Sequence, residues 1–154
     1  MRKGFILGVL GLFLLASCEN SVYTERREIS STTWDYSDSL IFEFSPPDTQ
    51  SLYNIELTVE HSKDFDYQNL YMRLHTIFPN QDTLKQPFSI DLSDKFGQWL
   101  GDCSSTSCER SSLLQAQTRF EYLGLYTLLF EQFSRYDSLA GINALEIDIY
   151  PVEK

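Results

Sequence analysis

The sequence lacks an apolar run long enough to span a membrane. A spanning helix needs about 20 apolar residues, whereas the longest uncharged apolar run covers only residues 4–16. Two basic residues precede this run and small residues follow it. A basic start, a short apolar core and a small-residue end are the pattern of a secretory signal peptide. Residues 1–17 are therefore expected to be an export signal that is removed.

The end of this signal carries a cysteine. Residues 15–18 read Leu-Ala-Ser-Cys, which resembles the lipobox of bacterial lipoproteins. The resemblance implies cleavage before Cys18, diacylglycerol on its sulfur, and a further acyl chain such as palmitate on its amino group. Each buried methylene contributes about 0.8 kcal/mol, and two acyl chains already give stable attachment. We expect a lipid anchor at Cys18; a plain signal peptide followed by an incidental cysteine is the alternative.

Basic residues are scarce. The chain has 12 lysines and arginines against 22 aspartates and glutamates, which gives a net charge of −10, and removal of the signal makes it more acidic. The densest basic pair, Arg26-Arg27, is flanked by Glu25 and Glu28. Such a surface repels nucleic acid and anionic lipid headgroups. Nucleic acid is not expected as a partner, and membrane contact is expected to come from the lipid anchor.

Only three cysteines occur, and Cys18 is assigned to the anchor. Cys103 and Cys108 remain, in the segment GDCSSTSCERS. In an exported chain an even pair favours a disulfide, with free thiols or a metal site as alternatives. A zinc site needs further ligands, and the two histidines, His61 and His75, are not at zinc-type spacing. We expect a disulfide, and neither a metal nor another cofactor.

Motifs for catalysis are missing. The sequence has no G-x-S-x-G, no H-E-x-x-H and no glycine-rich phosphate loop, and catalysis needs a nucleophile, a base or a metal in a defined constellation. Asp64 and Asp66 resemble part of a calcium loop, but Asn69 and His75 stand where an EF-hand has glycine and glutamate. A solvated turn explains the segment better. No catalytic residue is assigned, and an enzyme is not expected.

What the sequence does contain is repeated alternation of apolar and polar residues. Tyr53, Ile55, Leu57 and Val59 alternate with polar residues in the clearest case. A period of two is typical of a strand with one buried face. The other segments with this pattern are 40–45, 70–77, 84–92 and 145–150, and a first strand is possible at 22–29.

Two further segments, 113–122 and 125–133, are predicted to form a hairpin around Leu123-Gly124. Apolar residues, Phe133 among them, occupy both faces of the second segment, so it is expected to be buried on both faces and to be a central strand. Pro87 cannot donate a ladder hydrogen bond, which indicates that 84–92 lies toward a sheet edge. The best candidates for short helical turns lie near 113–116 and 138–142.

Together these patterns predict an all-β fold. We expect a single antiparallel β-sandwich of about eight strands, with few or no helices beyond the signal peptide. The predicted organisation is a removed signal at 1–17, the lipidated cysteine and a tether at 18–37, and the sandwich at 38–154.

Aromatic residues make up 14% of the chain, and they are the best candidates for a contact surface. Trp34 and Trp99 are predicted as possible partner or ligand contacts, since aromatic rings suit protein interfaces and stacking on sugars. Trp99 stands in a connection between strands, within KFGQWLGDC. A tryptophan there either closes one end of a sandwich or points outward, and both interpretations stay open.

The order of these features resembles a known family. The lipobox cysteine is followed by TTWDYSDSLIFEF, a Tyr-x-Ile-x-Leu strand, DFDYQNLYMRL, FPNQDTLKQPFSIDL, GQWLGD, LYTLLFEQ and LEIDIYP. This order and spacing resemble the gliding motility lipoprotein GldH family of the Bacteroidetes over nearly all of the mature chain. The loop from Cys103 to Cys108 departs from the expected family pattern, which puts in doubt only the role of that loop.

The resemblance implies a non-enzymatic lipoprotein, an accessory or scaffold of the envelope machinery for gliding motility and the linked type IX secretion system. Its partners would be envelope proteins of that machinery. Only the lipidated Cys18 carries over as a functional residue. Glu19-Asn20 is not a clear acidic export tag, so the expected location is the outer membrane, facing the periplasm. The alternative function is a surface glycan-binding lipoprotein with a carbohydrate-binding-like β-sandwich.

Overall fold

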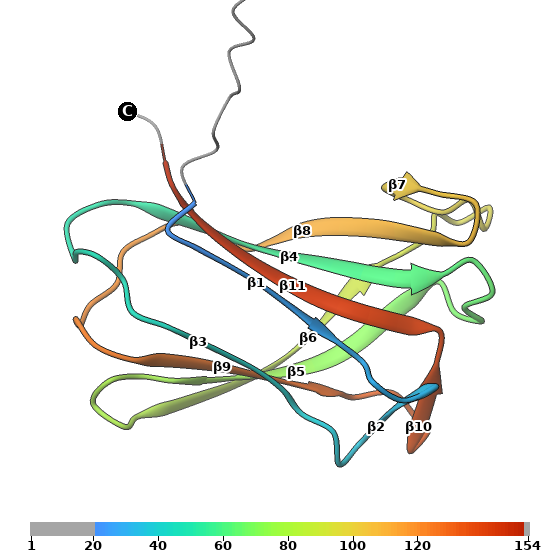
Figure 1. The fold of residues 1–154 in the computed structure, drawn as a ribbon, viewed down its shortest axis with the longest axis horizontal. Coiled ribbons are helices and arrows are strands. Elements are labelled where there is room, and N and C mark those ends of the chain that lie inside the picture. Colours follow the sequence, from blue (N-terminus) through green and yellow to red (C-terminus); the bar gives the residue numbers. More distant parts are fainter. Residues whose placement is uncertain (1–20, 153–154) are drawn as a thin grey trace, which may run out of the picture.

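Alternation in the sequence becomes alternation of burial in the computed structural model, which describes residues 21–152. In strand β11 (Ile142–Pro151), Leu145, Ile147 and Ile149 are fully buried, whereas the acidic residues between them are partly exposed. Because successive side chains of a strand point to opposite faces, one face of β11 packs inward and the other faces water. All strand pairs among the described residues are antiparallel (Figure 1).

Five strands form the larger sheet, in the order β1-β11-β4-β8-β7. β11 and β4 lie at its centre, and their pairing runs from Pro151 opposite Tyr53 to Ile142 opposite His61. β8 pairs with the other side of β4, and β7 covers only the beginning of β8. The bounds are β1 Tyr23–Glu28, β4 Tyr53–Ser62, β7 Asp102–Cys103 and β8 Ser107–Thr118.

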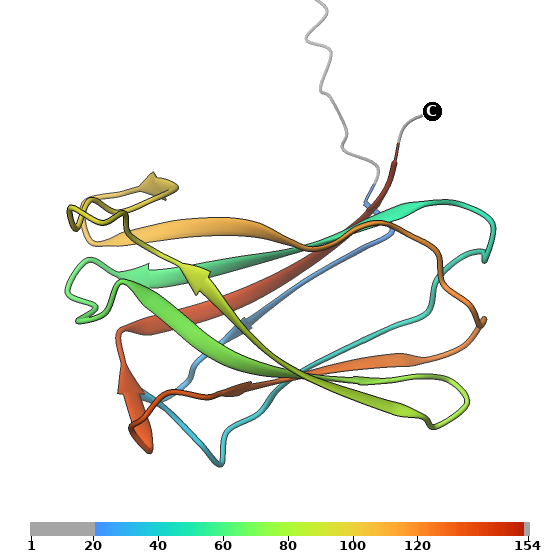
Figure 2. The ribbon, with the colours of Figure 1, turned by 180° about the vertical axis from the view of Figure 1, so that it is seen from behind.

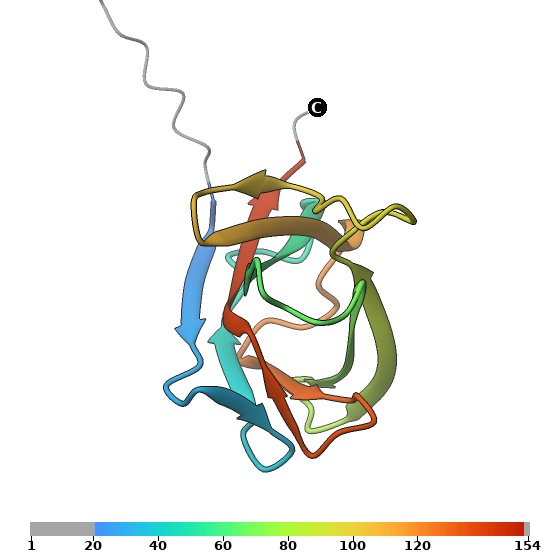
Figure 3. The same cartoon turned by 90° about the vertical axis from the view of Figure 1, so that its right-hand side faces the viewer.

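Four strands form the second sheet, in the order β3-β9-β5-β6. It faces the larger sheet as the second layer of a sandwich (Figure 1). A two-stranded sheet of β10 and β2 lies at one end of the sandwich (Figure 3). The bounds are β2 Thr33–Asp35, β3 Leu40–Phe44, β5 Asn69–Ile77, β6 Thr83–Asp91, β9 Tyr126–Gln132 and β10 Ser138–Ala140.

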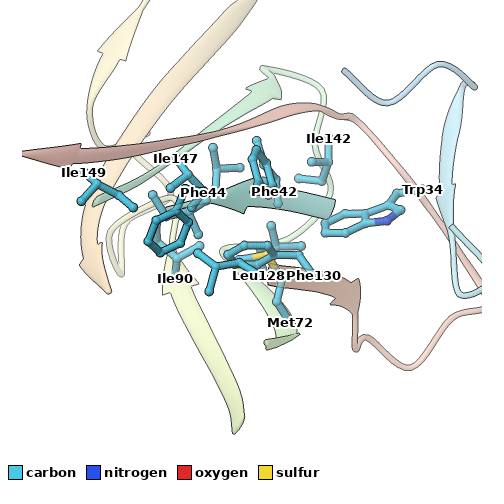
Figure 4. Packing of buried hydrophobic residues seen from close by; sticks show 14 of the residues in the cluster. Trp34, Phe42, Phe44, Met72, Ile90, Leu128, Phe130, Ile142, Ile147 and Ile149 are labelled. Atoms are coloured by element: carbon cyan, nitrogen blue, oxygen red, sulfur yellow. The ribbon is translucent and has the colours of Figure 1, made fainter. Parts of the chain in front are cut away.

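Side chains of both sheets meet in one core (Figure 4). The rings of Phe42 in β3 and Phe130 in β9 pack edge to face, with centroids 5.6 Å apart, and Phe88 of β6 lies 6.1 Å from Phe130. Ile147 and Ile149 belong to the same core and come from the facing sheet. Aromatic pairs in this geometry contribute about 0.5–1.5 kcal/mol each beyond the burial of their area.

The predicted all-β sandwich is confirmed, and its strand count differs for a simple reason. Eight strands coincide with the alternating segments of the sequence, and three more are two or three residues long. Strands this short contain too few residues to show a period. The two candidate helical turns are also strands, because 113–116 lies within β8 and 138–142 spans β10 and the start of β11. None of the elements in residues 21–152 is a helix able to cross a bilayer.

The hairpin predicted around Leu123-Gly124 is wrong. β8 ends at Thr118 and pairs with β4 in the larger sheet, whereas β9 begins at Tyr126 and pairs with β3 and β5 in the other sheet. The connection therefore crosses from one layer to the other. Phe120 is buried within it and packs 5.2 Å from the ring of Tyr126. Alternation cannot distinguish a hairpin from such a crossing, because both join two strands through a turn.

β9 is central in its sheet, as predicted, but it is not buried on both faces. Its inward residues Tyr126, Leu128 and Phe130 are almost fully buried, whereas Leu125 and Phe133, just beyond its ends, are about half exposed. The central position follows instead from its pairing with β3 on one side and β5 on the other. β6, which contains Pro87, is the edge strand that its proline indicates.

The folded domain begins before the predicted boundary at residue 38. β1 lies within the possible first strand at 22–29 and pairs with β11 along its whole length. Trp34 in β2 is 0% exposed and belongs to the core. Residues 23–37 therefore supply a sheet strand and a core side chain and do not form a tether. Of the predicted tether, residues 18–20 lie outside the described residues.

Trp34→Ala is expected to lower the free energy of unfolding by about 3–5 kcal/mol, because it leaves a cavity in the core. It also removes the indole N–H that donates to the Asp38 carbonyl at 2.6 Å. Urea unfolding measures the loss. The matched control is Phe96→Ala, at a side chain that is 83% exposed, which should stay within about 0.5 kcal/mol of the parent. Equal losses in the two variants would contradict the core position of Trp34.

Candidate functional site

The most prominent exposed aromatic cluster lies at the end of the sandwich that holds β10. Tyr67, Tyr71, Phe133 and Tyr136 line a concavity of about 550 Å³. Their side chains are 39–56% exposed. The rings of Tyr67 and Tyr136 lie beside each other in its lining, with centroids 5.9 Å apart and planes inclined by 32°. We refer to these four residues and the concavity as the tyrosine groove.

One wall of the groove is the loop from Phe133 to Asp137, which a buried amide organises. The side chain of Gln132, at the end of β9, is 2% exposed. Its Nε2 donates to the carbonyl oxygens of Tyr136 at 2.8 Å and Asp137 at 3.2 Å, and its Oε1 accepts from the Ser134 N–H at 2.9 Å. A buried amide must satisfy its hydrogen bonds, and here the loop supplies the partners. The loop is thereby held in one conformation.

The opposite wall is the connection between β4 and β5. Phe65 is buried, and its ring packs 5.5 Å from the ring of Tyr67 at a steep angle. Phe65 also fills the space beside Gly141, where a Cβ atom would meet its ring at 3.2 Å. The buried phenylalanine thus anchors the loop, and the tyrosine two residues later remains exposed. The pKa of Tyr67 is raised, chiefly by partial burial and then by the neighbouring Tyr136.

The floor of the groove continues into the outer face of the β5–β9 pair. The Arg73 guanidinium lies 4.0 Å from the centre of the Phe133 ring, in a cation–π contact. Arg73 also pairs with Glu131 at 3.9 Å, and His75 Nε2 lies 3.0 Å from the same carboxylate. Arg73 does not line the concavity itself, but Arg135 does. The groove therefore combines aromatic faces with a guanidinium and hydroxyl groups, a composition common at protein interfaces.

Trp34, predicted as a possible contact, is not available to a partner. It is completely buried, and its indole N–H donates to the Asp38 carbonyl. Trp99 is partly buried against the core, and its ring lies 4.7 Å from that of His61. The backbone of Trp99 forms a single β-bridge with Ser93. This packing matches a tryptophan that closes one end of the sandwich, although part of the ring remains exposed.

The two histidines lie in different surroundings. His61 is fully buried in β4, where its Nδ1 donates to the Ser62 carbonyl oxygen at 3.0 Å and its Nε2 has no hydrogen-bond partner among residues 21–152. Burial lowers the pKa of His61 because a charged ring would be poorly solvated there. The side chain of His75 is paired with Glu131. In the described part of the chain, no three acidic, histidine or cysteine side chains gather as a metal site, Asp64 and Asp66 included.

Cys103 and Cys108 are joined by a disulfide in the structure. They lie opposite each other at the end of the short β7–β8 pair. Just before β7, the backbone at Gly101 passes close to the Glu109 carbonyl oxygen, and a Cβ atom at this position would lie 2.1 Å from that oxygen. Gly101 also has a φ of +85°, so glycine is the residue that fits here. Cys18, the predicted lipidation site, lies outside the described residues.

The chain is similar to proteins of a known family. A family model described as GldH lipoprotein matches residues 21–149, which is most of the chain. The chain belongs to the GldH lipoprotein family. It is also 26% identical over 151 residues to a gliding motility lipoprotein GldH homolog of Christiangramia forsetii, a match that covers 95% of this chain and 91% of that protein. No solved structure matches the chain.

Membership in this family identifies the chain as a gliding motility lipoprotein and supports a lipid-anchored location in the cell envelope. The suspected family is thus confirmed. Neither description names an enzymatic activity.

Only weak signals in the sequence point to the tyrosine groove. Its residues come from two stretches that are far apart in the chain: Tyr67 and Tyr71 around the start of β5, and Phe133 and Tyr136 in the loop after β9. Tyr71 occupies the polar face of its strand, and a large aromatic residue on a face expected to be wet is the one local hint. Phe133 was expected to be buried. The meeting of the two stretches depends on the pairing of β5 with β9, which alternation cannot reveal.

Replacing both Cys103 and Cys108 by serine is expected to lower the free energy of unfolding by about 2 kcal/mol, because the closed loop of roughly six residues no longer restricts the unfolded chain. Urea unfolding without reductant measures the loss. Reduction of the parent protein is the matched control and should reproduce it. An unchanged unfolding midpoint in both cases would show that the pair contributes no stability.

His61 should make the domain less stable in mild acid. In the unfolded chain His61 takes up a proton near its ordinary pKa of about 6.5, but in the folded protein its lowered pKa delays this. Its contribution is therefore fully present above about pH 6.5 and is lost as the pH falls toward the folded pKa. His61→Phe should reduce the difference in unfolding free energy between about pH 7.5 and about pH 5.5. Equal differences in parent and variant would contradict this.

Proposed function

We propose that this chain is a non-enzymatic accessory or scaffold component of the gliding motility machinery and the linked type IX secretion system. Its lipidated Cys18 would anchor it in the outer membrane, with the domain facing the periplasm. Family membership supports the envelope location and the link to gliding motility. The family is described as a lipoprotein and not as an enzyme, which supports a non-enzymatic role.

The observation that carries the proposal is the tyrosine groove. Tyr, Phe and Arg are enriched where proteins bind one another, and residues of these types often dominate the binding free energy. The buried Gln132 holds one wall of the groove, and the buried Phe65 holds the other. A surface held in shape before binding loses less conformational entropy when a partner arrives. We therefore assign the groove as the contact for an envelope protein of the machinery, with the exposed part of Trp99 as a second candidate contact.

The groove assignment predicts that Tyr67→Ala combined with Tyr136→Ala reduces recovery of the partner about tenfold or more, because both rings are interface anchors. The measurement is affinity recovery of the tagged, lipidated protein from mildly cross-linked envelopes, with mass spectrometry of the proteins that accompany it. A control variant, Phe96→Ala, removes an exposed side chain away from the groove. Urea unfolding establishes that both variants remain folded.

Two results would contradict the proposal. If the parent protein brings down no component of the gliding or secretion machinery, the scaffold role is wrong. If such components are recovered equally by the groove variant and the control variant, the role stands but the groove is not the contact.

The alternative function, glycan binding, has one observation in its favour. The half-exposed rings of Tyr67 and Tyr136 offer stacking surfaces, and Asn69 beside them offers an amide for sugar hydroxyls. The burial of Trp34 removes one of the two tryptophans on which this function was based. A glycan array probed with the complete protein in lipid nanodiscs distinguishes the two functions. Binding that disappears in the Tyr67→Ala, Tyr136→Ala variant would favour the glycan.

A further inference from the structure

The connection from β8 to β9 carries two exposed leucines. Between Thr118, the last residue of β8, and Tyr126, the first of β9, the chain crosses from the larger sheet to the smaller one. Leu123 and Leu125 in this connection are 64% and 54% exposed. Turns are dominated by glycine, proline, asparagine, aspartate and serine, so a pair of exposed leucines around a glycine is unusual. We refer to residues 119–125 as the leucine loop.

The leucine loop is braced from within by aromatic residues. The Tyr126 hydroxyl donates to the Tyr122 carbonyl oxygen at 3.2 Å and accepts from the Tyr122 N–H at 3.1 Å. Phe120 is buried, and its ring packs 5.2 Å from that of Tyr126. These rings fill the space beneath the loop. The two leucines therefore remain outside the core.

Packing places the leucine loop near the start of β1. The ring of Tyr23, the first residue of β1, lies 5.5 Å from that of Phe44, and Phe44 lies 5.4 Å from Phe120 of the loop. Gly124 lies against the turn between β5 and β6, because a Cβ atom there would meet the Pro79 Cβ at 3.1 Å. The loop, this turn and the connection from β3 to β4 thus occupy the end of the sandwich at which the described chain begins (Figure 2).

The position of the anchor brings this end of the domain to the membrane. Only Glu19 and Asn20 stand between Cys18 and Ser21, where the described chain begins. A chain of this length reaches at most about 11 Å even when it is fully extended. The acyl chains of a lipidated Cys18 hold its sulfur at the membrane surface. The end of the sandwich with the leucine loop is then the end nearest to the bilayer.

Charge favours an apolar contact with the bilayer over an electrostatic one. The loop carries Arg119 and Glu121, whose charges cancel, and the two neighbouring connections carry Asp48 and Asp82. Anionic headgroups are not attracted to such a surface. Leucine side chains, in contrast, are stabilised when they leave water for an apolar layer. Tyr122 of the same loop is of a residue type enriched at the boundary between membrane and water.

We propose that Leu123 and Leu125 insert into the surface of the bilayer that holds the lipid of Cys18. The inference rests on the anchor assigned in the proposed function, and it adds a second point of contact. A domain held at one point can turn about it, whereas two points restrict its orientation. The tyrosine groove lies near the start of β11, at the opposite end of the sandwich, and therefore faces away from the bilayer.

The test compares a polarity-sensitive fluorophore at the two ends of the domain. Leu123→Cys carries it in the leucine loop, and Phe96→Cys carries it in the connection between β6 and β7, at the other end. Cys103 and Cys108 are paired and do not react with the label. The complete lipidated protein is reconstituted in nanodiscs of zwitterionic lipid, part of which bears a nitroxide just below the headgroups. Emission from residue 123 should shift to the blue and be mostly quenched, and emission from residue 96 should do neither.

A charge in the loop tests whether the contact is apolar. With the fluorophore at residue 123, Leu125→Asp should restore most of the lost emission, because a carboxylate is costly to place in the apolar layer. Phe96→Asp, at a side chain that is 83% exposed, is the matched control and should leave the quenching unchanged. Urea unfolding establishes that both variants remain folded.

Mass spectrometry of the N-terminal peptide separates the possible results. Acyl chains on Cys18 together with equal quenching at residues 123 and 96 would overturn the membrane contact and leave the anchor intact. Quenching at residue 123 that Leu125→Asp does not relieve would overturn the insertion of the leucines. A Cys18 without acyl chains would overturn the anchor, and this inference with it.

Discussion

The tyrosine groove depends on how β9 is buried. The inward side chains of this strand, Tyr126, Leu128, Phe130 and Gln132, are all nearly inaccessible. Phe130 packs against Phe42 and Phe88 and holds the strand in the core. Gln132, the last residue of the strand, fixes the loop that forms one wall of the tyrosine groove. A single row of buried side chains therefore fills the core and positions one wall of the groove.

The sequence predicted the elements of the fold better than their partners. Alternation located the eight longer strands because each buries one face, and Pro87 identified an edge. Alternation is a local property, however, and which strands pair depends on contacts between distant segments. The crossing between β8 and β9 was therefore predicted as a hairpin. Trp34 was placed in a tether because β2 is too short to show a period. The groove was missed for the same reason as the crossing, since two distant stretches of the chain build it.

The direction of the strands bears on how the domain would carry force. The described chain begins beside the end of β11, where Val22 donates to the Ile149 carbonyl oxygen, and the groove lies beyond the start of β11. The two points are separated by the length of a ten-residue strand, roughly 30 Å. A pull between a membrane anchor and a partner in the groove would act along the strands, across the hydrogen bonds that join β1 to β11. All six residue pairs of that ladder would be loaded in shear together, the arrangement in which a sheet resists unzipping one bond at a time.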